Sequence, residues 1–184
     1  MRWAKGSTLA AVLVALAAGC GGGGSDDEGT VPAEEWAGSV CTSVARWTGS
    51  LEDATNRLRS PEQITVNGFK GAVNSAVEAT QQFVDEIGAL GAPSTDAGAE
   101  AKSELDQLSS TLEDDANELS EQVDSASDGL SGLLTKLSAI TSTLSDMSSA
   151  VGTTFDRISN LDGAAELEAA FQDADSCKEL GSTR

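Results

Sequence analysis

Apolar residues recur at alternating intervals of four and three along most of the chain from residue 36 onwards. The first run consists of Trp36, Val40, Val44, Trp47, Leu51, Ala54 and Leu58. This spacing places the apolar side chains on one narrow stripe of an α-helix. Such a stripe is buried only when it packs against the stripes of other helices. The pattern therefore predicts an all-α protein in which helices lie side by side.

Three further runs with the same spacing follow, and a shorter run comes last. They are Phe69, Val73, Ala76, Thr80, Phe83, Ile87 and Leu90; Ala101, Leu105, Leu108, Leu112, Ala116, Leu119 and Val123; Leu130, Leu133, Leu137, Ile140, Leu144, Met147, Val151, Phe155 and Ile158; and Leu167, Ala170, Phe171, Ala174 and Cys177. We expect an up-down antiparallel four-helix bundle with a short fifth helix at the C-terminus.

Turn and capping residues separate these runs. Ser60 to Gln63 form a capping box with Pro61 at the first helical position, which predicts that the second helix starts there. Gly91-Ala92-Pro93 ends that helix, and Ser94, Thr95 and Asp96 offer caps for the third. Asn160-Leu161-Asp162-Gly163 predicts the turn before the short last helix.

The boundary between the third and fourth helices is the least marked. Gly129 and Gly132 lie in a stretch rich in serine, which favours a turn at residues 125–132. The alternative is one continuous helix over residues 96–160, which would form a rod about 95 Å long.

The cysteines favour the turn. An up-down bundle returns the C-terminal segment to the level where the first helix begins, so Cys177 can reach Cys41. A continuous rod would carry its far end tens of Å away. We therefore predict a Cys41–Cys177 disulfide, which in the chain-entropy model stabilises the fold by about 4–5 kcal/mol.

Residues 1–19 have the features of a signal peptide. Arg2 and Lys5 give a positive start, and an apolar run from Leu9 to Ala18 follows. The run is shorter than the roughly 20 residues that span a bilayer. It ends in small residues before Cys20.

The segment from Leu16 to Cys20 resembles the lipobox of bacterial lipoproteins. In that family the signal peptide is cleaved between the residues that correspond to Gly19 and Cys20. The cysteine thiol carries a diacylglycerol with acyl chains such as palmitate. The family prefers a larger aliphatic residue where this chain has Ala17, with Leu16 one place earlier, so ordinary signal-peptidase cleavage is the alternative.

Residues 20–32 are rich in glycine and acidic residues, which is typical of a flexible tether. We thus divide the chain into a signal peptide at 1–19, a lipidated tether at 20–32 and a helical domain at 33–181. This organisation predicts a protein held on the extracytoplasmic face of the bacterial membrane through lipid on Cys20.

Charge and composition exclude several functions. The chain has 30 acidic and 11 basic residues, for a formal charge of −19, and such a surface repels nucleic acid. Histidine is absent, so Ser-His-Asp and Cys-His catalytic sites and histidine metal sites cannot form. We expect no enzyme activity, no cofactor and no bound metal.

Two patterns have simpler explanations than a functional site. Carboxylates cluster on the third helix, but their spacing is that of one solvated face without a calcium-binding loop. They are Glu113, Asp114, Asp115, Glu118 and Glu121. Trp36 and Trp47 each begin a W-x-G pattern found in small secreted helical-hairpin proteins, but both lie on the apolar stripe, which predicts core packing.

The whole chain resembles the small, acidic, helical lipoproteins of high-GC Gram-positive bacteria. The resemblance rests on the lipobox, the glycine tether, Val40-Cys41 before Trp47, and the segment from Asp173 to Cys177. It implies a location in the cell envelope. We expect a non-enzymatic module that binds or spaces envelope components. The alternative is a small-ligand binder with a pocket beside the small stripe residues Ala54, Ala76, Thr80, Ala101 and Ala116.

Lipidation of Cys20 is directly testable. Cells that express the full chain and are fed a labelled fatty acid should incorporate the label, because the Cys20 thiol is the predicted acceptor. Cys20→Ala should abolish both the label and partition into the membrane fraction. Unchanged labelling of this variant would show that the anchor assignment is wrong.

Overall fold

The computed structural model of the protein describes residues 30–59, 65–125 and 129–182. Within these residues the chain forms helices joined by short connections, together with one pair of two-residue strands. The elements are β1 (Thr30–Val31), α1 (Ala33–Arg59), α2 (Val66–Gly88), β2 (Ala92–Pro93), α3 (Gly98–Asp124), α4 (Gly129–Ser159), α5 (Ala165–Asp173) and α6 (Asp175–Ser182). The prediction of an all-α protein is confirmed.

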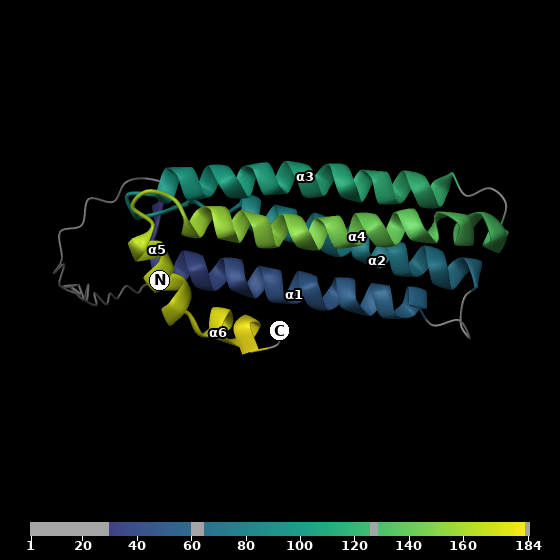
Figure 1. Ribbon diagram of the computed structural model, residues 1–184, viewed down its shortest axis with the longest axis horizontal. Coiled ribbons are helices and arrows are strands. Elements are labelled where there is room, and N and C mark those ends of the chain that lie inside the picture. The colour runs from purple at the N-terminus through teal and green to yellow at the C-terminus, as the bar shows by residue number, and fades with distance from the viewer. Residues whose placement is uncertain (1–29, 60–64, 126–128, 183–184) are drawn as a thin grey trace, which may run out of the picture.

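The four long helices lie side by side and share one long axis (Figure 1). The main helix–helix contacts join α1 to α2, α2 to α3, and α3 to α4, so neighbours in sequence are neighbours in space. The short helices α5 and α6 pack against α1 near its beginning.

The predicted stripes form the core. Every stripe residue of α1 and α3 is buried, and so are those of α2 from Phe69 to Ile87. On α4 the buried stripe residues are Ile140, Leu144, Met147, Val151 and Ile158, while Leu137 and Phe155 are half-buried. Trp36 and Trp47 are both buried, which confirms core packing for the two W-x-G sequences.

The third and fourth helices are separate, as the glycines and the cysteines predict. α3 ends at Asp124, α4 begins at Gly129, and the two helices pack against each other. A continuous helix over residues 96–160 is therefore excluded.

Two predicted helix starts are wrong. The N-cap of α2 is Thr65, whose extended backbone precedes the helix and whose hydroxyl oxygen accepts a hydrogen bond from the Gly68 N–H at 3.0 Å. The helix therefore starts at Val66 and not at Pro61; the capping box at 60–63 lies outside the described residues. The N-cap of α3 is Ala97, which makes no side-chain capping hydrogen bond. The predicted caps Ser94, Thr95 and Asp96 all lie before it.

The end of the predicted tether is part of the folded body. Thr30 and Val31 pair in parallel with Ala92 and Pro93, and the Ser94 N–H donates to the Val31 carbonyl at 2.8 Å. The chain enters α1 from a position fixed on the connection between α2 and α3. Two residues are too few for a strand signal in the sequence.

The C-terminal segment contains two helices where the sequence predicts one. Ala174 interrupts the helical pattern with ψ near 123°, which is extended backbone. The bend at Ala174 turns α6 away from the direction of α5. The bend brings α6 into contact with α1, whereas a single straight helix would continue in the direction of α5.

A buried polar contact ties α1 to α2. The Trp47 indole N–H donates to the Thr80 hydroxyl oxygen at 3.0 Å, and the Thr80 hydroxyl donates to the Ala76 carbonyl at 2.8 Å. The indole ring stacks on Phe83, with 5.2 Å between the ring centroids. Thr80 thus satisfies the one polar atom of a large buried side chain.

Thr80→Val should destabilise the protein by about 1–3 kcal/mol, because it keeps the side-chain volume but leaves the buried Trp47 N–H without an acceptor. Urea unfolding followed by circular dichroism measures the loss. The same substitution in a Trp47→Phe background, which has no indole donor, should cost clearly less. Equal losses in the two backgrounds would contradict the role of the hydrogen bond.

Candidate functional site

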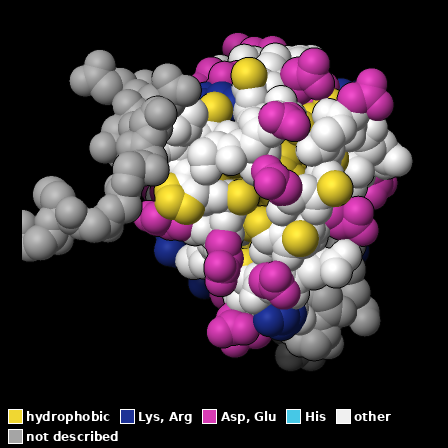
Figure 2. All heavy atoms as spheres, turned by 90° about the vertical axis from the view of Figure 1, so that its left-hand side faces the viewer, with side chains coloured by type: hydrophobic (Ala, Val, Ile, Leu, Met, Phe, Trp, Pro, Cys, Tyr) yellow, Lys and Arg dark blue, Asp and Glu magenta, His cyan; other side chains and the backbone are white. Residues whose placement is uncertain are grey.

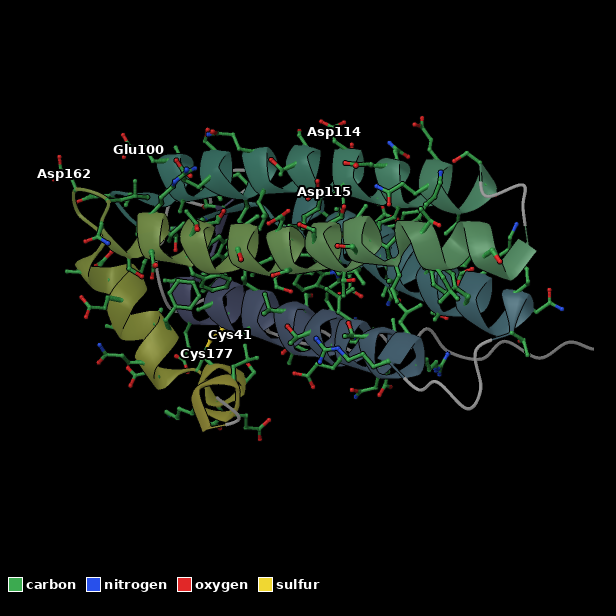
Figure 3. The ribbon with its side chains drawn as sticks, turned by 45° about the vertical axis from the view of Figure 1, so that its right-hand side comes forward. Cys41, Glu100, Asp114, Asp115, Asp162 and Cys177 are labelled. Atoms are coloured by element: carbon green, nitrogen blue, oxygen red, sulfur yellow. A yellow bond between two sulfur atoms is a disulfide. The ribbon has the colours of Figure 1, made fainter. Side chains whose placement is uncertain are left out.

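The structure joins Cys41 of α1 to Cys177 of α6 in a disulfide, with 5.1 Å between the Cα atoms (Figure 3). This is the pair that the sequence predicts. Cys41 is buried, and Cys177 is half-buried. Gly19 and Cys20, the predicted cleavage and lipidation residues, lie outside the described residues. The disulfide therefore marks the one predicted site that the structure describes.

Aromatic and alanine packing surrounds the disulfide. Phe171 of α5 contacts Trp36 edge to face at 5.8 Å between ring centroids, and it contacts Phe155 of α4 at 5.5 Å. On the same side of α1, Ala37 is buried against Ala170 and Ala174. The short C-terminal segment thus covers the first turns of α1.

The Trp36 indole N–H is buried there without a hydrogen-bond partner in the part of the chain that the structure describes. A buried donor without an acceptor costs about 1–3 kcal/mol. The apolar packing of α5 on α1 therefore offsets the free-energy cost of the unpaired Trp36 N–H.

A shallow depression of about 770 Å³ lies beside the disulfide, between α1, the end of α2 and the start of α6. Its lining residues are Pro32, Glu34, Glu35, Gly38, Ser39, Thr42, Ser43, Arg46, Glu86, Ala174, Asp175 and Ser176. Four carboxylates and one guanidinium make its surface mainly acidic. Acidic side chains are also spread over the left-hand end of the molecule in Figure 1, which faces the viewer in Figure 2.

Glu86 is the most constrained of these carboxylates. A hydrogen bond from the Ser43 hydroxyl is the main cause that holds the pKa of Glu86 below its ordinary value. The Gln82 amide, which donates to Glu86 Oε1 at 2.9 Å, and the Arg46 guanidinium, which pairs with the same oxygen, act in the same direction. Partial burial opposes them. Glu86 is consequently ionised and fixed in place at neutral pH.

The acidic cluster on α3 is a solvent-facing side of the helix. Four of its five carboxylates are exposed, and Asp115 is half-buried on the side that faces α4 (Figure 3). Burial, then the charges of Glu118, Asp146 and Asp114, raise the pKa of Asp115. Within the described ranges, no three histidine, cysteine, aspartate or glutamate side chains form a group that could hold a metal ion.

The small stripe residues proposed to leave room for a ligand are all buried between helices. Two of them, Thr80 and Ala116, also line a hollow of about 250 Å³ between α2 and α3. Ligand pockets typically have volumes of about 300–1,000 Å³. Close approach of the helices is therefore the better supported role for these residues.

Sequence reasoning missed the polar residues of the depression. Ser43, Arg46 and Glu86 come from two helices, and Ser176 comes from a third; the Ser176 hydroxyl donates to the Gly38 carbonyl at 3.0 Å. Their spacing in the sequence carries no motif. Only the cysteine pair indicated that α6 would lie here.

Comparison of the chain with protein-family models, with curated proteins and with solved structures finds no match in any of the three. In addition, none of the helices in the described ranges combines the length and the apolar character needed to cross a membrane. The functional interpretation therefore rests on the geometry of this chain and on its sequence.

Ser43→Ala should raise the pKa of Glu86 towards its ordinary value, because it removes the main hydrogen bond to the ionised form. A pH titration of the Glu86 side-chain carboxyl carbon by NMR measures the shift. Gln82→Ala is the matched control and should raise this pKa by less. A larger shift with Gln82→Ala would reverse the assigned order of the two hydrogen bonds.

This pKa also sets the sign of the pH effect on stability. Because the folded-state pKa is lowered, the ionised carboxylate stabilises the fold above its ordinary pKa. That contribution is lost as the pH falls through the folded-state pKa. The stability difference between the wild type and Ser43→Ala should therefore be larger at neutral pH than in acid.

Proposed function

We propose that the protein is a lipid-anchored, non-enzymatic module of the bacterial cell envelope. In this proposal a four-helix, up-down bundle holds a binding surface away from the extracytoplasmic face of the membrane. The proposed anchor is a diacylglycerol on Cys20, and the proposed class is the small acidic lipoproteins of high-GC Gram-positive bacteria. The partner is another envelope component.

The observation that carries the proposal is the position of β1, where the chain enters the folded body. β1, the beginning of α1, and the short helices α5 and α6 all lie at one end of the elongated body (Figure 1). α1 and α3 end, and α2 and α4 begin, at the opposite end of the body (Figure 1). An anchor that enters through β1 therefore leaves the opposite end farthest from its point of attachment.

The lengths of the elements support a spacing role. α1 has 27 residues, which corresponds to about 40 Å along the helix axis. The pairing of β1 with β2 fixes the point where the tether joins this body. A rigid body attached at this end can hold its opposite end up to about one helix length away from the point where the tether joins it.

The charge of the surface supports a lipid anchor over direct adsorption. With a formal charge of −19, the chain is repelled by anionic headgroups, so attachment requires an acyl chain or an apolar segment and not a basic face. The same charge keeps the surface soluble and disfavours nucleic acid as a partner.

The orientation is testable with a dye placed at either end of the body. The full chain, lipidated and inserted into vesicles with acceptor-labelled lipid, would carry the dye at exposed Asp162, near the tether, or at exposed Glu121, near the opposite end. Energy transfer to the bilayer should be clearly greater from position 162, because the body stands away from the membrane.

Cys20→Ala versions of both labelled proteins are the controls and should show transfer from neither position. Equal transfer from the two positions in the lipidated protein would contradict the spacing role, because the body would then lie flat on the membrane.

A further inference from the structure

Helix α6 is held differently from every other helix. Among its described side chains, residues 175–180, none is fully buried. It attaches to α1 through the Cys41–Cys177 disulfide and through the Ser176 hydroxyl, while Leu180 packs half-buried against the main core. A helix of eight residues is too short to be stable alone, so its structure depends on these attachments.

Helix α5, in contrast, is held by packing. Leu167 is fully buried, Ala170 is buried, and the Phe171 ring contacts aromatic rings of both α1 and α4. The extended backbone of Ala174 separates the two helices. The chain therefore has a bend between a segment fixed by its core side chains and a segment fixed by a covalent bond.

The carboxylate of Asp175 forms an ion pair with Lys178 of the same helix, with 3.3 Å between Oδ1 and Nζ. Asp175 lines the same depression as Glu34 and Glu35 of α1, so carboxylates stand on both of its walls. The ion pair of Asp175 lies within α6 and adds nothing to the attachment of this helix to α1.

We propose that the Cys41–Cys177 disulfide is a redox latch. Its reduction releases α6 from α1 by movement at Ala174, while α5 and the four long helices stay folded. Asp175 and Ser176 form one wall of the depression beside the disulfide, so the depression exists in the oxidised protein and opens in the reduced one. The latch depends on the folded body alone and not on the proposed lipid anchor.

The chemistry is thiol–disulfide exchange with a dithiol reductant. A reductant thiolate attacks the Cys177 sulfur, which is more exposed than that of Cys41, and Cys41 leaves as a thiolate that takes up a proton. The second thiolate of the reductant then attacks the mixed disulfide and releases Cys177, which is also protonated. Two electrons and two protons pass from the dithiol to the protein, and the reductant becomes a disulfide.

Hydrogen exchange of the full-length protein, followed by mass spectrometry with and without dithiothreitol under native conditions, tests the latch. Reduction should accelerate exchange of the α6 amides by at least about tenfold, because opening of the helix exposes them. At short exchange times α5 and the four long helices should stay protected. Only their slowest amides, which exchange through global unfolding, should accelerate, because the disulfide no longer restricts the unfolded chain.

Two variants separate the covalent bond from the local contacts. The Cys41→Ser/Cys177→Ser double variant should reproduce the reduced protein without any reductant. Ser176→Ala removes the hydrogen bond to Gly38 but keeps the disulfide, and it should leave α6 protected to within about threefold of the wild type. Reduction of the folded wild type keeps the test available if the double variant does not fold.

Either of two results would overturn the proposal. Unchanged exchange of α6 on reduction would show that its non-covalent contacts suffice. Loss of protection of α5 or of any long helix at short exchange times would show that the disulfide holds more than α6 and does not act as a local latch.

Discussion

The narrow width of the apolar stripe on each long helix is the constraint on which the structure depends. A stripe with alternating steps of four and three covers one side of a helix and leaves the rest polar, so no helix can bury its stripe alone. Packing the four stripes together builds a core from leucine, isoleucine, valine and alanine, with tryptophan and phenylalanine at a few positions. The acidic residues are left on the outside, where water and salt moderate their repulsion.

The parts of the fold that follow from periodicity could be predicted from the sequence, and the parts that depend on single residues could not. Every predicted stripe residue of α1 and α3 is buried, because the spacing of apolar residues in the sequence is the spacing of the helix face that packs against its neighbours. The sequence places the start of α2 too early, because Ser60 and Thr65 are both good N-cap residues and the sequence alone does not rank them. The bend at Ala174 has no sequence signal, since alanine favours a continuous helix.

The candidate site divides in the same way. Cys41 and Cys177 could be paired from the sequence because a covalent bond demands closeness and an antiparallel route supplies it. The Ser43, Arg46 and Glu86 group is formed by two helix faces whose relative rotation the sequence does not specify. A polar group formed by residues of two helices can be identified only when the arrangement of the helices in space is known, even where every helix is predicted correctly.

The disulfide joins the first helix of the chain to the last described helix, and this pairing has a consequence for proteolysis. Surface connections between helices are preferred sites of protease cleavage. One cut anywhere between Cys41 and Cys177 leaves two pieces that are still covalently joined, because the bond spans 136 residues of chain. A single nick between α3 and α4 therefore releases no part of the body. Loss of the C-terminal piece requires a cut and a reduction together, so damage to one connection alone leaves the two pieces joined.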